Sequence, residues 1–152
     1  MKHNLQFTIP TFTEEFDVFP IPDNEKYDYW VPLLKKFIEQ SDTIEIHCWN
    51  DEKDHINEMT LVFRGVSKIV NEGNITIIKG KITDDISNHV LYDNVKTNGK
   101  LKWFSIFLSR NNTPVFQSEH WGTEFFAPNL GDDDIANIKS MTPADTNFYQ
   151  YQ

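Results

Sequence analysis

Apolar and polar positions between Leu101 and Trp121 follow the pattern of a β-hairpin, with two β-rich runs on either side of Asn111-Asn112. Asparagine tolerates the positive φ angles of a tight two-residue turn, so this pair is the predicted turn. The register that follows pairs Leu108 with Val115, Phe107 with Phe116 and Trp103 with His120. The first run is apolar on both faces, which is typical of a strand inside a sheet.

Alternation of apolar and polar residues predicts further strands. It is clearest from Ile44 to Trp49, where Ile44, Ile46 and Cys48 share one face of the strand. The other predicted strands are Leu5 to Ile9, Met59 to Phe63 with a continuation over Val66 to Val70, Ile75 to Ile82, Thr123 to Ala127, and a short one at Val90 to Tyr92. The polar segments Asn50 to His55 and Asp84 to Gly99 are predicted to be loops.

A period of three to four residues between Tyr27 and Ile38 predicts an amphipathic helix. Its apolar stripe consists of Tyr27, Trp30, Val31, Leu34, Phe37 and Ile38. Pro32 fits only the first turn of a helix, so the helix is expected to begin near Tyr29 or Trp30 and to end near Gln40. A shorter helix is expected after its cap at Asp132, with a buried stripe of Ile135, Ile138 and Met141 and with Pro143 at its end.

These elements predict a single α+β domain over residues 1–152. We expect an antiparallel, meander-like sheet of five to seven strands, with one amphipathic helix packed on a face and a short C-terminal helix. The arm from Phe12 to Pro22 is expected to pack its phenylalanines on a neighbour, and the tail from Asn147 either frays or folds back. Beyond the helix stripe, the predicted core comprises Ile44, Ile46, Leu61, Phe63, Ile77, Phe104, Ile106, Leu108 and Val115.

The net charge of the chain restricts the classes of molecule that it is expected to bind. With 14 basic and 23 acidic residues, the chain has a formal net charge of −9. Such a surface repels phosphate backbones and anionic membranes, so direct binding of nucleic acid or of a membrane is not expected, whereas a basic protein is attracted. The single cysteine, Cys48, suits a reducing compartment, and the N-terminal residues lack a signal-peptide pattern. The expected location is the cytoplasm.

A first constellation of residue types used in metal binding is His47, Cys48, Asp51, Asp54 and His55. Its spacing matches no standard zinc or metalloprotease pattern. Neighbouring residues of a strand point to opposite faces, so His47 and Cys48 are not expected to share an ion. We therefore expect no resident metal or cofactor, with a site held by His47 and His55 as the alternative.

A second constellation is Trp103, Glu119, His120 and Trp121. In the predicted register His120 lies opposite Trp103, where a histidine with Glu119 beside it could serve as the general base of a hydrolase. Alternatively, Trp30, Trp103 and Trp121 form the walls of a small-ligand pocket. The sequence contains no serine elbow or cysteine dyad to complete a mechanism, so a non-enzymatic function is favoured.

Acidic residues also cluster beside aromatic ones in segments predicted to be loops. The predicted partner-binding residues are Trp49, Asp51, Glu52, Asp54, Asp84 and Asp85. Carboxylates steer a basic partner and an exposed tryptophan anchors it, whereas the competing explanation is that the charges only maintain solubility. The favoured function is an acidic protein that inhibits or sequesters a basic protein partner. Immunity proteins that neutralise bacterial nuclease toxins are a class with these properties, and the analogy extends to that class only.

Overall fold

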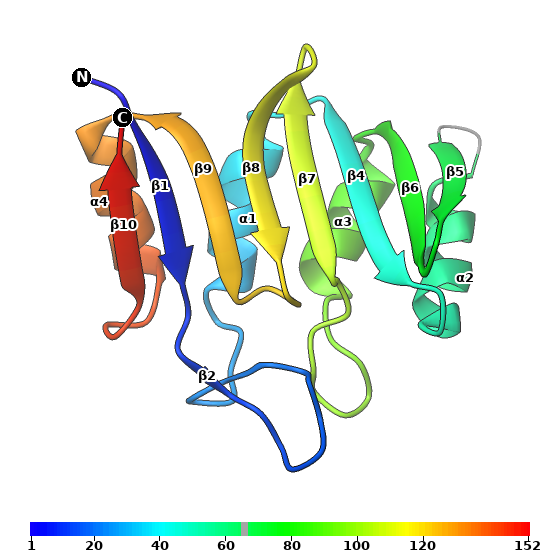
Figure 1. Cartoon of the computed structure of the whole chain (residues 1–152). Helices are drawn as coiled ribbons and strands as arrows, with labels where there is room; N and C mark the ends of the chain where they lie inside the picture. Colours follow the sequence, from blue (N-terminus) through cyan, green and yellow to red (C-terminus); the bar gives the residue numbers. More distant parts are fainter. Residues whose placement is uncertain (65–66) are drawn as a thin grey trace.

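The computed structural model describes residues 1–64 and 67–152, which form an eight-stranded antiparallel sheet with helices against one face (Figure 1). The strands are β1 (His3–Thr8), β2 (Thr11–Phe12), β3 (Ile21–Pro22), β4 (Thr43–Trp49), β5 (Ser67–Glu72), β6 (Ile75–Lys81), β7 (Ser105–Arg110), β8 (Thr113–Glu119), β9 (Glu124–Leu130) and β10 (Asn147–Tyr151). The helices are α1 (Trp30–Ile38), α2 (Lys53–Val62), α3 (Asp84–Tyr92) and α4 (Asp132–Met141). The predicted α+β class and antiparallel sheet are confirmed, but strands and helices are more numerous than expected.

The main sheet has the strand order β10-β1-β9-β8-β7-β4-β6-β5, and β2 and β3 pair separately. Figure 1 shows α4 behind β10, α1 behind β9 and β8, α3 behind β7 and β4, and α2 behind β6 and β5. In the described part of the chain, no helix covers the opposite side of the sheet, which we call the open face. A two-layer arrangement of this kind buries one side of each strand and leaves the other side in contact with water.

Burial along β4 follows this arrangement. Ile44, Ile46 and Cys48 are buried against the helices, whereas Glu45 and His47 are only partly covered on the open face. The main core lies between the two layers, and its largest fully buried side chains include Trp30, Trp103, Phe7, Phe37, Phe63 and Phe116. A smaller cluster of Phe19, Ile21 and Trp121, with Trp49 and Phe104, joins the N-terminal arm to the β8–β9 turn.

Most of the predicted core is confirmed, including Ile44, Ile46, Phe63, Ile106 and Leu108, but four predicted members lie elsewhere. Leu61 is 70% exposed on α2. Ile77 is partly exposed on the open face, where it pairs with His47, and Ile78 takes the core position. Phe104 belongs to the smaller cluster and Val115 is only half-buried against the main core.

Three segments were predicted with the wrong secondary structure, wholly or in part. The predicted loop Asn50 to His55 ends in a helix, because α2 begins at Lys53. The predicted strand Met59 to Phe63 lies mostly in α2, whose buried residues His55 and Met59 are spaced by four rather than two. The predicted loop after Asp84, with its short strand, is α3. Thr83 caps this helix by accepting a hydrogen bond of 3.2 Å from the Ile86 amide. Gly65 and Val66, where the predicted strand was to continue, lie outside the described residues, and β5 follows them.

The other predicted elements are present with small shifts. Helix α1 begins at Trp30, and the tail folds back as β10. Helix α4 has Gly131 at its N-cap instead of Asp132, and the Gly131 amide donates to the Asp134 carboxylate at 3.1 Å. The first turn of α4 is wholly acidic, as favoured by the helix dipole.

The predicted turn of the central hairpin is confirmed, but the predicted register is wrong. Asn111 and Asn112 have φ angles of 49° and 63°, and Arg110 pairs with Thr113 across them. A bulge between Leu108 and Ser109 then shifts the pairing by one residue, so that Leu108 faces Phe116 and Phe107 faces Gln117. Trp103 precedes β7 and turns into the helix layer, so it does not face His120.

Helices in residues 1–64 and 67–152 are all too short, or too polar, to cross a membrane.

Candidate functional site

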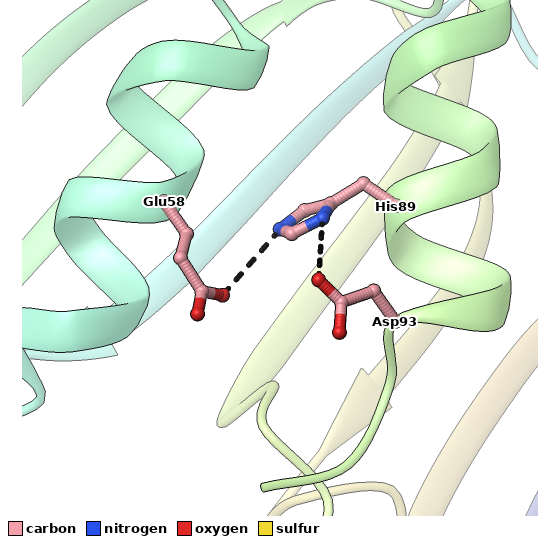
Figure 2. Close-up of side chains that lie close together, drawn as sticks. All are labelled: Glu58, His89 and Asp93. Carbon is pink, nitrogen blue, oxygen red and sulfur yellow. Dashed lines mark ion pairs between the residues drawn. The ribbon is translucent and has the colours of Figure 1, made fainter.

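A polar cluster lies between α2 and α3 and contains Glu58, His89 and Asp93 (Figure 2). One potential ligand atom from each of these residues lies within 4.8 Å of the others, so among the described residues this cluster has the spacing of a possible metal site. The His89 ring stands between the two carboxylates, with Nδ1 at 3.2 Å from Asp93 and Nε2 at 3.8 Å from Glu58. Sequence reasoning missed the cluster because it placed His89 in a loop.

Lys102 occupies the cation position of this cluster. Its Nζ lies 2.8 Å from an Asp93 oxygen and 3.0 Å from a Glu58 oxygen, and its side chain is 7% exposed. Burial disfavours the ammonium, but hydrogen bonds to Asp93 and Glu58 outweigh that effect and raise the pKa of Lys102. A divalent ion would have to displace an ammonium that already neutralises both carboxylates, so we interpret the cluster as a clamp between helices and not as a metal site.

Asp93 and His89, beside Lys102, both have lowered pKa values, but for different reasons. Hydrogen bonding to Lys102 lowers the pKa of Asp93. Burial lowers the pKa of His89, because the charged imidazolium is poorly solvated there. The ring of His89 packs edge-on to Trp103, with centroids 5.2 Å apart, and the His55 ring does so from α2 at 6.5 Å.

Trp30 and Trp103, two predicted walls of a ligand pocket, are fully buried core residues. Both indole N–H groups donate to the Val90 carbonyl, at 3.0 and 3.1 Å. That carbonyl belongs to the last turn of α3, whose carbonyls have no partner within the helix. The two tryptophans thus complete a helix end and do not line a cavity.

The histidine of the predicted hydrolase pair contacts a different carboxylate from the one predicted. His120 Nδ1 lies 2.7 Å from Glu124, not from Glu119, and about half of its side chain is exposed. His120, Trp121 and Gly122 all have positive φ angles in the tight β8–β9 turn, and the Trp121 indole N–H donates to Glu52 at 3.2 Å. Trp103 lies in the main core and Trp121 in the smaller cluster, so the four predicted residues do not converge.

The predicted docking residues fall into two groups at opposite ends of the neighbouring strands β4 and β6. Asp51 and Asp54 follow the end of β4, whereas Asp84 and Asp85 follow the end of β6, beside the start of β4. Seven residues of strand separate these positions by about 20 Å. Glu52 accepts hydrogen bonds from the Trp49 amide and the Trp121 indole, and its side chain is 10% exposed, so it is occupied internally. Trp49 packs on Phe104, with centroids 5.2 Å apart.

The first metal constellation likewise disperses. His47 faces outward and contacts Glu45 at 2.7 Å, Cys48 is fully buried on the other side of β4, and His55 lies on α2. Burial raises the pKa of the Cys48 thiol well above its ordinary value, so this cysteine is unreactive in the folded chain.

Aromatic and amide side chains alternate in one row across the open face. Cross-strand pairing places them in the order Phe107, Gln117, Phe126, Gln6 and Tyr149, one from each of β7, β8, β9, β1 and β10. Neighbouring strands lie about 4.8 Å apart, so successive aromatic residues are separated by about 10 Å. Gln6 and Tyr149 are exposed, and the other three are partly covered. The row continues through Glu45 and Lys79 to Lys68 at the other end of the sheet.

Carboxylates stand beside this row. Glu119 and Glu124 are directly opposite each other on β8 and β9, next to a shallow hollow of about 400 Å³ that Gln117, Phe126 and Tyr151 also line. Like charges in opposite positions tend to destabilise a sheet, and here the contact of His120 Nδ1 with Glu124 at 2.7 Å counters that tendency. The strands β10, β1, β9, β8, β7 and β4 together contain one lysine or arginine, Arg110 at the last position of β7. This part of the open face is therefore acidic and aromatic.

A groove of about 650 Å³ lies at the other end of the hairpin. Its lining includes Phe37, Arg110, Pro114, Val115, Phe126 and Leu130. None of the residues predicted to form a ligand pocket takes part in it. This groove lies near the start of β8 and the end of β9, whereas the Glu119–Glu124 pair lies at the opposite end of these two strands.

No protein-family model, curated protein or solved structure matches this chain. Its function is therefore inferred from its own residues. The open face brings together Glu45, Glu119, Glu124, Phe107 and Phe126, none of which is among the predicted partner-binding residues. Alternation along the strands contained this signal, because these residues take the positions opposite the core.

Proposed function

We propose that this chain is a non-enzymatic binding protein whose open face covers a basic surface of a protein partner. The observation that carries the proposal is the Glu119–Glu124 pair beside the row of Phe107, Phe126 and Tyr149. Two carboxylates that face each other on neighbouring strands can be bridged by a cation from a partner.

The chemistry of this face suits lysine and arginine side chains. A guanidinium group can bind a carboxylate with two hydrogen bonds, and either cation can lie over an exposed aromatic ring. Six strands of five to seven residues give a footprint of about 25 by 20 Å, which is of the order required for a specific protein–protein interface. Lys68 and Lys79 at the far end of the row would repel a uniformly basic partner there and so restrict its orientation.

Neutralisation of a toxin is the form of this function that we favour. A basic nuclease surface attracts the −9 charge of the chain, and once covered it can no longer bind nucleic acid. Among the described residues, the cluster of Glu58, His89 and Asp93 most resembles a catalytic centre. The His89 side chain in it is nine-tenths buried, and Lys102 neutralises the carboxylates. That arrangement favours binding over catalysis.

Charge reversal on matched surfaces tests the proposal. The tagged chain is expressed in its source cells, and recovered proteins are compared for the parent and three double variants. These are Glu119→Lys with Glu124→Lys, Asp51→Lys with Asp54→Lys, and Asp84→Lys with Asp85→Lys. Each changes the net charge equally, so only the first should lose a stoichiometric basic partner.

The recovered partner is then expressed with and without the chain to measure its toxicity or nuclease activity. Equal loss of the partner in all three variants would mean that net charge alone drives association. Loss only with Asp51 and Asp54 would transfer the site to the start of α2, and retention in every variant would overturn the proposal.

A further inference from the structure

The two outer strands of the sheet differ in their protection against pairing. Strand β5 carries Lys68 and Glu72, whereas β10 consists of Asn147, Phe148, Tyr149, Gln150 and Tyr151 and has no charged residue and no proline. Its five pairs with β1 continue without a bulge. Charges, prolines and bulges are the usual means by which an edge strand avoids joining another sheet, and β10 has none of them.

The outer edge of β10 is open to solvent. Within residues 1–64 and 67–152 the strand pairs only with β1, and Figure 1 shows it as the last strand, with α4 behind it. Asn147, Tyr149 and Gln150 are exposed, and Tyr149 is 62% exposed. Tyr149 and Tyr151 stack on the open face with centroids 5.3 Å apart, so the strand presents an ordered aromatic edge.

We propose that β10 pairs antiparallel with β10 of a second copy of this chain, so that two sheets join into one across a twofold axis at Tyr149. In this register Tyr149 faces Tyr149 of the second copy, Phe148 faces Gln150, and Asn147 faces Tyr151. Aromatic and amide residues therefore meet at the seam, and no charge faces a like charge. An interface in which one patch contacts itself is the usual geometry of a homodimer.

Charges behind the seam are complementary as well. The twofold axis makes the two α4 helices antiparallel, so the Asp132–Asp133 end of one is directed toward the Lys139 end of the other. Lys139 already lies beside the strand, with Nζ 5.3 Å from the Phe148 ring. The remaining net charge of each chain opposes association over longer distances, so added salt should strengthen the dimer.

The joined sheet also extends the aromatic row of the open face. Gln6 and Tyr149 of one copy would be followed by Tyr149 and Gln6 of the other, on the same side of the sheet. The inference does not depend on what binds that face, because it rests on the edge of β10 and on the α4 helix behind it.

Sedimentation velocity of the purified chain, over a range of concentrations and salt, measures the association. A species of twice the 17.9 kDa chain mass, favoured by salt, is expected. Tyr149→Lys places two ammonium groups opposite each other and should raise the dimer dissociation constant by about tenfold or more. Gln6→Lys is the matched control, because it adds the same charge one strand inward and should leave the constant nearly unchanged.

Cysteine crosslinking tests the register. Tyr149→Cys should form an intermolecular disulfide under mild oxidation, whereas the parent chain, with only buried Cys48, should not. Val70→Cys on the opposite edge strand β5 is the control for edge pairing at the other end of the sheet. A chain that stays monomeric at all concentrations, a dimer that Tyr149→Lys does not weaken, or a crosslink at Val70→Cys alone would each overturn the proposal.

Discussion

Removing the cation of the α2–α3 clamp should destabilise the fold in a pH-dependent way. Lys102→Met keeps the buried methylene groups but removes the ammonium that lies 2.8 Å from Asp93 and 3.0 Å from Glu58. A hydrogen bond to a charged group contributes about 1.5–3 kcal/mol when both partners are buried. The Glu58 and Asp93 side chains are 41% and 57% exposed, so water can replace part of each bond. With that discount we expect a loss of about 2 kcal/mol in the free energy of unfolding at pH 7.5.

The loss should be smaller at pH 5.5 because His89 can replace the missing charge. Burial lowers the pKa of His89 in the folded parent, so protonation of His89 destabilises the parent as the pH falls below about 6.5. Lys102 contributes to that lowering, whereas Asp93 and Glu58 oppose it. Without Lys102 one of the causes of that lowering is removed, so the pKa of His89 should move up toward its ordinary value and protonation should destabilise the variant less. The parent therefore loses stability on acidification and Lys102→Met loses less.

Urea unfolding of both proteins at pH 7.5 and pH 5.5 measures this difference. The control is Lys100→Met. Lys100 contacts Glu14 and Asp17 at 3.7 and 3.5 Å, and these contacts are more exposed than those of Lys102. Its removal should therefore cost less than about 0.5 kcal/mol at either pH. In the His89→Gln background, the effect of Lys102→Met should become independent of pH. A loss for Lys102→Met that is the same at both pH values would refute the role assigned to His89.

Two further substitutions test local features of the fold. Gly122→Ala should destabilise the chain by about 2–4 kcal/mol. The φ angle of Gly122 is +75°, and the new Cβ would meet the Leu101 side chain and lie 3.1 Å from the Trp30 ring. Gly73 also has a positive φ, of +61°, but open space around it, so Gly73→Ala should cost only about 1 kcal/mol. Urea unfolding of both variants checks this, and equal losses would contradict the packing argument. Thr83→Ala should lower the free energy of unfolding by about 1 kcal/mol, because it removes the N-cap hydrogen bond of α3. Thr83→Ser keeps the hydroxyl, so it should preserve most of that stability.

The elements that could be predicted from the sequence are those with a long and regular pattern. The stripe from Trp30 to Ile38 and the alternation from Ile44 to Cys48 each involve several large apolar residues, and both were assigned correctly. In helix α2 only His55 and Met59 are buried, with the partly covered Ile56 and the polar Asn57 and Glu58 between them, so its period is too weakly marked to distinguish it from a loop or a strand. Thr83, the N-cap of α3, is a residue type that indicates a helix start, but the polar residues after it were interpreted as a loop.

The candidate sites were harder to predict because they depend on which strands become neighbours. Glu119 and Glu124 are close in the chain, but Phe107, Gln6 and Tyr149 join their surface only through the order β7-β8-β9-β1-β10. The bulge between Leu108 and Ser109 decides that Gln117 rather than Phe116 faces Phe107 on the open side. Lys102 reaches Glu58 through the turn of residues 93–102, where Val95 bridges to Leu101. None of these contacts is set by local spacing.

The Glu119–Glu124 pair connects stability with the proposed function, and the two can be separated by one substitution. Glu119→Gln removes one charge of the opposed pair but keeps a polar side chain of the same shape, so it should raise the free energy of unfolding by about 0.5 kcal/mol at low salt. Added salt should reduce this gain, because both side chains are accessible to screening ions. The same substitution should weaken binding of a basic partner, since one of two carboxylates that attract it is lost. Greater stability with weaker binding, measured by urea unfolding and by titration with the recovered partner, is the result expected of a residue kept for binding. Greater stability with unchanged binding would mean that the partner does not contact this pair, and lower stability would mean that Glu119 has a structural role.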